Sequence, residues 1–295
     1  MAKPPWTTLV EVADLAEALG CRAGAPPPAR LPEDVLLLDA RHDLADTARG
    51  PRAYAAGHLP GALHVHVDRD LSGPITPRTG RHPLPDVDVW QATCSRWGID
   101  AGVQVVAYDD FGGAWASRAW WLLRYYGHDA VAVLDGGIPA WTRAGMPTTR
   151  EVVKRRAREF TGRPGHMPVV TAWDLRTRAP RCLVDARGPA RYAGKEEPID
   201  PVAGHIVGAV NVPFAGNTDA EGRFLPRDAL RVRYEAALAG RSPRDAAFYC
   251  GSGVTAPHDI LAMEVAGLPG AALYPGSWSE WIRDPARPVA KGETP

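Results

Sequence analysis

The sequence predicts an α/β protein of two similar domains, each a mostly parallel sheet with helices on both faces. A chain of 295 residues exceeds one average domain. One pattern of motifs occurs twice along it, and in both copies short apolar runs alternate with helical patterns. Because parallel strands are usually covered by helices on both faces, this alternation favours a layered α/β fold.

The internal repeat is carried by motifs at nearly constant spacing. The run VLLLDARHD around Asp39 returns as CLVDARGP around Asp185, 146 residues later. The run GHLPGALHV from Gly57 returns as GHIVGAVNV from Gly204, 147 residues later. This regularity indicates two copies of one domain.

Apolar runs rich in valine, leucine and alanine are predicted to form the buried strands of both sheets. They span residues 35–39, 103–108, 130–134, 182–185, 246–249 and 271–274. The basic segment 151–168, broken by glycine and proline, is interpreted as a solvated linker rather than a nucleic-acid-binding arm. We therefore place the domains at residues 1–150 and 169–295.

Charge, hydropathy and cysteine content exclude several classes of protein. The 34 basic and 34 acidic side chains leave no net charge to attract nucleic acid or an acidic membrane. No window approaches the roughly 20 apolar residues of a membrane helix, and acidic residues stand where a signal peptide would be apolar. The four scattered cysteines predict neither a disulfide framework nor a metal site. We expect a cytoplasmic protein without metal, cofactor, membrane or nucleic-acid partner.

Cys250 is the candidate nucleophile, because it follows a predicted strand directly and precedes a helix predicted over 256–266. Ligands of such sheets lie beyond the carboxyl ends of the strands, at the N-termini of helices. Gly251 and Gly253 allow the backbone to curl its amides around the sulfur, and Thr255 is the expected N-cap. Such a site favours a reactive thiolate over a merely packed thiol.

The remaining cysteines, Cys21, Cys94 and Cys182, fit the role of buried packing residues. In the first copy Asp110 stands 140 residues before Cys250, within YDDFGGAW. We expect Asp110 to cap the following helix rather than to act as a catalytic carboxylate. The domain of residues 1–150 is accordingly expected to be catalytically inactive.

From about Trp6 to Trp281 the sequence resembles the tandem-rhodanese sulfurtransferases, which use thiosulfate or 3-mercaptopyruvate. The resemblance implies that Cys250 accepts sulfane sulfur from a small anionic donor and becomes a persulfide. It further implies that the outer sulfur passes to cyanide or to a thiol such as thioredoxin or glutathione. The segment similar to the six-residue persulfide loop of this family comprises Cys250, Gly251, Ser252, Gly253, Val254 and Thr255.

The resemblance also bears on the donor. Thiosulfate-using members tend to carry basic residues after the cysteine, whereas Gly251 and Ser252 resemble the mercaptopyruvate enzymes and slightly favour that donor. The triad proposed for those enzymes would here comprise Ser252, His82 and Asp68. A surface histidine and a turn-capping aspartate are alternative roles for the last two.

A keto acid requires a cation for its carboxylate, and the arginine fork provides one. Arg191 aligns with the substrate-binding arginine of the family, but nine residues later Asp200 stands where mercaptopyruvate enzymes usually offer a second arginine. A carboxylate there is expected to repel an anionic donor. Arg187 is a further candidate, although a structural ion pair with a buried carboxylate is the favoured interpretation.

Three alternative functions stay open at this point. They are a thiosulfate-preferring sulfurtransferase, a non-catalytic sulfur-carrier or partner-binding module, and a cysteine-dependent phosphatase. The phosphatase is least favoured, because Ala256 occupies the place of the arginine that would bind the phosphoryl group.

Overall fold

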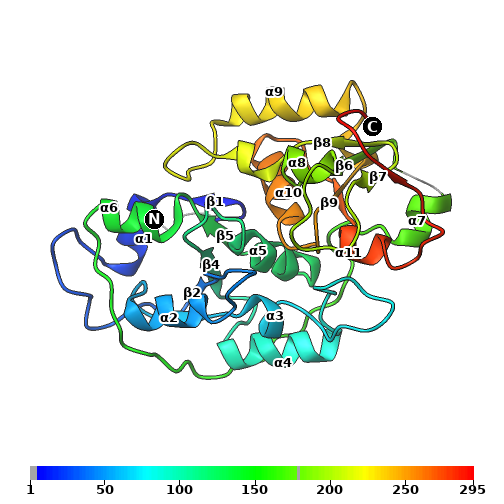
Figure 1. The fold of residues 1–295 in the computed structure, drawn as a ribbon. Coiled ribbons are helices and arrows are strands. Elements are labelled where there is room, and N and C mark those ends of the chain that lie inside the picture. Colours follow the sequence, from blue (N-terminus) through cyan, green and yellow to red (C-terminus); the bar gives the residue numbers. More distant parts are fainter. Residues whose placement is uncertain (1–4, 178–179) are drawn as a thin grey trace. The chain divides into compact units, whose positions relative to one another are not determined.

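A computed structural model describes residues 5–177 and 180–295, which group into two compact units. The first unit comprises the described residues of 1–71, 85–166 and 219–224, and the second those of 72–84, 167–218 and 225–295. Most of the first unit runs from blue to green in Figure 1, and most of the second from yellow-green to red. The domain limits 1–150 and 169–295, with the linker 151–168, remain a prediction.

The first unit contains a sheet in which every neighbouring pair of strands is parallel, in the order β1-β5-β4-β2-β3. Its interior strands are buried along almost their whole length, which explains their continuous apolar sequences. The strands are β1 (Leu9–Val10), β2 (Val35–Asp39), β3 (Ala62–His64), β4 (Gln104–Tyr108) and β5 (Val131–Leu134).

Helices connect these parallel strands, as the crossovers of a parallel sheet require. The central helix α5 is buried from Ala116 to Leu123, and in that stretch every residue except Arg118 is apolar or small. The helices of this unit are α1 (Val12–Leu19), α2 (Arg49–Ala56), α3 (Val67–Asp70), α4 (Val87–Trp97), α5 (Ala116–Tyr125) and α6 (Gly137–Arg143).

The second unit repeats this plan with a parallel sheet in the order β10-β9-β6-β8. Its strands are β6 (Cys182–Asp185), β8 (Ala209–Asn211), β9 (Ala246–Tyr249) and β10 (Ala272–Leu273), and β7 (His205–Ile206) pairs antiparallel with β11 (Val289–Ala290). The helices are α7 (Ala172–Thr177), α8 (Pro189–Tyr192), α9 (Arg227–Leu238), α10 (Ala256–Val265) and α11 (Ser277–Trp281), with 3-10 turns η1 (Phe214–Asn217) and η2 (Pro243–Asp245).

Strand register confirms the internal repeat. Asp39 pairs with Tyr108 at the ends of β2 and β4, and Asp185 pairs with Tyr249 at the ends of β6 and β9. All six predicted strands are present, although β10 is two residues shorter than the predicted 271–274. Within the described part of the chain, helices long and apolar enough for a membrane span are absent.

Candidate active site

The buried residue Cys250 directly follows strand β9, and the loop from there to α10 wraps around its sulfur. The amide of Gly253 donates to Cys250 Sγ at 3.1 Å. Gly253 has a φ of 81°, and a Cβ at this position would lie 2.2 Å from the carbonyl oxygen of Pro275. Glycine is therefore required twice over, for the backbone conformation and for space.

Hydrogen bonds to the sulfur decide the acidity of Cys250. Burial by itself raises the pKa of this thiol, but the hydroxyl of Thr255 and the amides of Ser252, Ala256 and Thr255 outweigh burial, so the pKa lies below its ordinary value. Thr255 is the N-cap residue of α10, as predicted, but its side chain makes no capping hydrogen bond. Its hydroxyl serves the sulfur instead.

The three remaining cysteines differ from Cys250 in this respect. Burial raises the pKa of Cys21, Cys94 and Cys182 above that of an ordinary thiol. All three are buried, as expected for packing residues. Cys250 is thus the cysteine whose surroundings favour a thiolate.

Helix α11 holds the first half of the loop. The amide of Trp278 donates to the carbonyl oxygen of Cys250 at 3.0 Å, and the amide of Ser279 donates to that of Gly251 at 2.9 Å. The amide of Cys250 in turn donates to Ser277 Oγ at 3.1 Å. The segment 276–281, GSWSEW, therefore fixes the backbone on which the thiol stands.

The segment 72–84 brings a histidine to this loop. His82 Nδ1 lies 2.7 Å from Ser252 Oγ, and both side chains are buried. Two members of the predicted triad are therefore in hydrogen-bond contact. The same segment contributes Arg81, whose amide donates to Ser279 Oγ at 3.1 Å.

The third predicted member, Asp68, belongs to the first unit, so its role in a triad stays a prediction. There it lies 3.9 Å from His42 Nε2 and 3.7 Å from His66 Nδ1. These three residues form the one group of potential metal ligands found among the described residues. His66 Nδ1 already accepts the amide of Asp68 at 3.2 Å as the N-cap of α3, so we assign no metal to the group.

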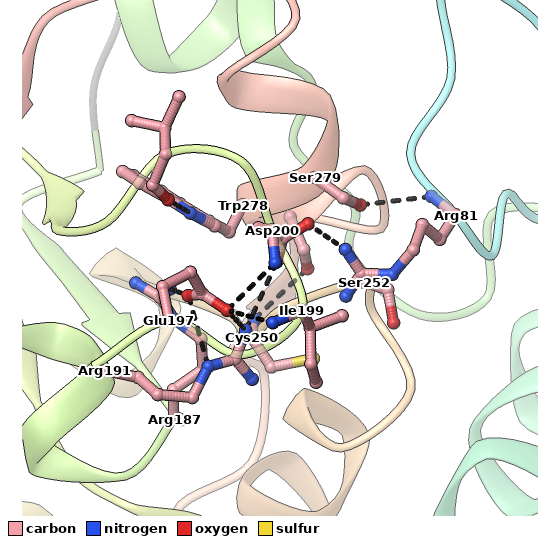
Figure 2. Close-up of polar contacts among 12 residues, drawn as sticks. Arg81, Arg187, Arg191, Glu197, Ile199, Asp200, Cys250, Ser252, Trp278 and Ser279 are labelled. Carbon is pink, nitrogen blue, oxygen red and sulfur yellow. Dashed lines mark hydrogen bonds and ion pairs between the residues drawn. The ribbon is translucent and has the colours of Figure 1, made fainter. Parts of the chain in front are cut away.

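A network of arginines and carboxylates lies beside the thiol loop (Figure 2). Arg191 donates from Nη2 to Glu197 Oε1 at 2.6 Å and to Asp200 Oδ2 at 3.2 Å. Arg81 donates from Nη1 to Asp200 Oδ1. Burial raises the pKa of Glu197, but the hydrogen bond and charge of Arg191 and the amides of Asp200 and Ile199 together outweigh burial, so the pKa lies below its ordinary value. Asp200, which was expected to repel an anionic donor, is held between two guanidinium groups.

Arg187 makes the structural ion pair that was the favoured interpretation. Its Nη2 donates to Asp185 Oδ2 at 2.7 Å and to the carbonyl oxygen of Gly204 at 2.6 Å. In the first unit Arg41 makes the same pair of bonds, to Asp39 Oδ2 at 2.6 Å and to the carbonyl of Gly57 at 2.8 Å. Because this arrangement recurs in the unit without the nucleophile, it serves the fold.

The first unit contains an equivalent amide nest, and our assignment of its key residue is corrected by the structure. Asp109, not Asp110, follows β4 and accepts the amides of Phe111, Gly113, Trp115 and Ala116 at 2.8 to 2.9 Å. Asp110 pairs with Arg49 instead, at 2.7 Å. The loop before α5 is one residue longer than the loop before α10. Counting back 140 residues from Cys250 therefore gives Asp110, one residue beyond the equivalent position, Asp109.

Sequence reasoning missed Arg81 and Glu197. Arg81 directly precedes His82, and Glu197 follows Arg191 by six residues. Both therefore lie close to residues that the sequence had already pointed to. Nothing in the local pattern distinguishes Arg81 from the other arginines nearby. Its place in the site follows from the packing of segment 72–84.

Comparison with known proteins agrees with this geometry. Residues 29–144 and 171–284 both match the model of the rhodanese-like domain. The chain belongs to the rhodanese family. Its relatives are sulfurtransferases, and the chain is an enzyme of that class.

The relatives differ in the donor that their names give. A probable 3-mercaptopyruvate sulfurtransferase of Pseudomonas aeruginosa is 46% identical over 271 residues, covering 90% of this chain and 95% of that protein. A putative thiosulfate sulfurtransferase of Mycobacterium tuberculosis is 40% identical over 290 residues, covering 96% and 97%. The solved structure of the 3-mercaptopyruvate sulfurtransferase of Leishmania major matches with a TM-score of 0.82 at 27% identity, covering 95% of this chain and 75% of that one.

Proposed function

We propose that this rhodanese-family enzyme moves sulfur from 3-mercaptopyruvate through a persulfide of Cys250 to a thiol or to cyanide. The observation that carries the proposal is the amide and hydroxyl cradle around Cys250 Sγ, which lowers the pKa of this thiol while the pKa of every other cysteine is raised. A lowered pKa provides a thiolate at neutral pH, and the thiolate is the attacking species.

In the first step the Cys250 thiolate attacks the donor sulfur. A sulfur–sulfur bond forms as the carbon–sulfur bond breaks, and the electron pair of that bond stays on carbon as the enolate of pyruvate. This carbon then takes up one proton, which balances the proton that the donor thiol brought to the site. Pyruvate and the persulfide are the products. The Ser252–His82 pair, at 2.7 Å, supplies a hydroxyl and an imidazole that can hold the enolate oxygen and move the proton.

In the second step the acceptor attacks the outer sulfur of the persulfide. The new bond joins that sulfur to the acceptor, and the Cys250 thiolate leaves with the electron pair of the broken sulfur–sulfur bond. The cradle stabilises the leaving thiolate as well as the attacking one, because the same hydrogen bonds act in both. Thioredoxin, glutathione and cyanide are the acceptors we propose, in a cytoplasmic setting that suits four unpaired cysteines.

Mercaptopyruvate is favoured because Gly251 and Ser252 offer amides and a hydroxyl, with no basic side chain within the loop itself. Thiosulfate is the second candidate, because two guanidinium groups adjoin Gly251 and can receive a sulfonate as well as a carboxylate. The two donors therefore need direct comparison.

The test measures kcat/KM for both donors side by side with cyanide as acceptor, together with the intact mass of donor-treated protein. We expect one added sulfur atom, on Cys250 by peptide mapping, and the higher kcat/KM for 3-mercaptopyruvate. A higher kcat/KM for thiosulfate would transfer the assignment to the second candidate. Absence of the added sulfur with both donors would refute the sulfurtransferase mechanism, and a gain of a phosphoryl group from a phosphate ester would support a phosphatase instead.

A further inference from the structure

A fully buried aspartate lies in the first turn of α10, the helix that follows the nucleophile. This residue, Asp259, comes three residues after Ala256, whose amide donates to Cys250 Sγ. Three residues span about 4.5 Å of an α-helix, so the carboxyl group lies on the order of 10 Å from the sulfur. A charge on Asp259 can therefore act on the thiolate.

The two oxygens of Asp259 have different surroundings. Asn217 Nδ2, on η1, donates to Asp259 Oδ1 at 2.6 Å, and the Tyr234 hydroxyl oxygen, on α9, lies 2.8 Å from the same atom. Oδ2 is buried and has no hydrogen-bond partner in the described part of the chain. The Arg233 guanidinium donates to Asn217 Oδ1 at 3.1 Å and to the carbonyl oxygen of Pro213 at 2.7 Å, rather than to Asp259. An ionised Asp259 would thus be a buried charge without a paired cation, which is costly.

The network around Tyr234 is one proton short when Asp259 is ionised. Arg233 Nε can only donate, so the Asn217 atom that it meets is the acceptor, Oδ1. The Tyr234 hydroxyl oxygen lies 2.9 Å from Asn217 Oδ1 and 2.8 Å from Asp259 Oδ1, but it carries a single proton. If that proton goes to one of these oxygens, the contact with the other needs a second proton. Asn217 Oδ1 cannot supply one, so the network is complete when Asp259 carries it.

The ionisable groups near Asp259 agree with a neutral acid. Burial raises the pKa of Asp259 to about 7, and the charge of Asp185 adds to this rise. Burial also keeps the proton on Tyr234, whose pKa lies well above its ordinary value. His258 Nδ1 accepts from Asn217 Nδ2 at 3.2 Å, so this imidazole is neutral in the network. The groups that act on Asp259 from the elements packed around α10 are Arg233 and Tyr234 of α9, His258 of α10 itself and Asp185 of β6, while β9 has only Tyr249, whose hydroxyl accepts the amide of Ile206, and β10 has no ionisable side chain.

We propose that Asp259 is a positioning residue of the nucleophile that acts as a neutral acid: its proton completes the links of α10 to η1 and α9, and its ionisation disfavours the Cys250 thiolate. Loss of the proton leaves one oxygen contact of Tyr234 without a hydrogen. It also places a negative charge near the amides of Thr255 and Ala256 that bind the sulfur, where it repels a thiolate. The inference goes beyond the proposed function, because it concerns the acidity of the thiol and holds for any sulfur donor or acceptor.

Infrared spectroscopy of the full chain tests the proton. At pH 6 the spectrum of the wild type minus that of Asp259→Asn should contain the carbonyl band of a protonated carboxylic acid, although an ordinary aspartate, with a pKa of 3.8, is ionised there. The band should disappear with an inflection near pH 7. The matched control, Asp228→Asn, changes an exposed aspartate in the first turn of α9 and should give no such band. A difference spectrum of Asp259→Asn without the band at pH 6 would overturn the proposal.

The effect on the thiol is tested by titrating both groups, with no sulfur donor present. The Cys250 inflection is followed by iodoacetamide alkylation, and the Asp259 inflection by its infrared band. Whichever group ionises second should carry the shift, because only that group meets a charge already in place. Either Asp259→Asn lowers the Cys250 inflection or Cys250→Ala lowers the Asp259 inflection, by about one pH unit for like charges on the order of 10 Å apart. If neither inflection moved, Asp259 would be a buried acid without influence on the nucleophile, and the positioning role would be refuted.

A second variant keeps the proposal testable if Asp259→Asn does not fold. Asn217→Ala retains the acid and removes one hydrogen bond that lowers the pKa of Asp259. The protonated carboxyl band, measured as the difference between spectra of one protein at pH 6 and pH 9, should therefore persist to higher pH in Asn217→Ala than in the wild type. A band with the same inflection in both proteins would contradict the proposed network.

Discussion

Ser252 Oγ and His82 Nδ1 lie 2.7 Å apart, although 170 residues separate them in the chain. The hydroxyl stands on the loop that carries the nucleophile, and the imidazole comes from segment 72–84, which packs with the second unit. Both side chains are buried, so water competes little for this hydrogen bond. The pair can exchange a proton two residues away from Cys250.

Ser252→Ala should lower kcat with 3-mercaptopyruvate by about 100-fold, the low end of the contribution of a positioned acid or base. The control is Ser242→Ala, an exposed serine whose side chain caps η2 by accepting the amide of Arg244. Because the two residues act as a pair, Ser252→Ala/His82→Gln should be no slower than the slower single variant. Rates that multiply in the double variant would show that the residues act separately.

Cys250→Ser should abolish sulfur transfer with either donor while leaving the midpoint of thermal unfolding nearly unchanged, because a hydroxyl can accept the same amides but is a far weaker nucleophile. Cys182→Ser is the matched control, since its sulfur also sits in a hydrogen bond, to the carbonyl oxygen of Ala237 at 3.5 Å. Pyruvate release and intact mass provide the measurement. Persulfide formation on Cys182 in the Cys250→Ser protein would point to another nucleophile.

The pH dependence of alkylation reports the lowered pKa of Cys250. With iodoacetamide and native protein, the rate at Cys250 should rise with pH and have its inflection below pH 9.0, the ordinary value for a thiol. Cys94, whose pKa burial raises well above that value, should stay unmodified across the same range. Peptide mapping separates the sites. Thr255→Val should move the Cys250 inflection upward, since the Thr255 hydroxyl no longer stabilises the thiolate.

Arg191→Ala should mainly raise KM for both donors, by about 10- to 100-fold, because a carboxylate clamp acts on ground state and transition state alike. The control Arg231→Ala removes an exposed arginine on α9 that pairs with Glu235, and should have little effect. Glu197 keeps its contact with Arg187 in the variant, so the fold is preserved. Wild-type KM values in Arg191→Ala would remove this residue from the donor site.

Asp109→Ala should destabilise the first unit by about 3 kcal/mol or more, because four backbone amides lose their buried acceptor. Asp110→Ala removes only a half-exposed ion pair with Arg49 and should cost about 1 kcal/mol or less. Urea unfolding of the two variants measures the difference. Equal losses of stability would mean that the Asp109 carboxylate does not hold this loop.

The sequence alone predicted that a strand leads into Cys250, Gly-Ser-Gly and a helix. It also showed the internal repeat, which predicts one parallel sheet in each copy. These features depend on short-range spacing, since apolar runs mark buried strands and glycines mark the turn that follows. The same logic predicted an ion pair of Arg187 with a buried carboxylate. The structure gives Asp185 as that carboxylate, two residues away, and the pair is repeated as Arg41 with Asp39. Local constraints of this kind leave a pattern in the chain.

Contacts between distant segments left no such pattern. Arg81 lies 119 residues before Asp200, and its guanidinium reaches the thiol loop because Gly80 packs on Gly276 and the Arg81 amide donates to Ser279 Oγ. The choice of Asp109 over Asp110 was decided by the pairing of Tyr108 with Asp39, because strand register determines which residue leaves the sheet first. A one-residue difference in loop length changes the spacing between equivalent residues of the two copies, but it does not change where a hydrogen-bonded strand ends. The place of Cys250 between a buried strand and a helix was therefore predictable from the sequence, whereas the charges that surround it depend on the tertiary structure.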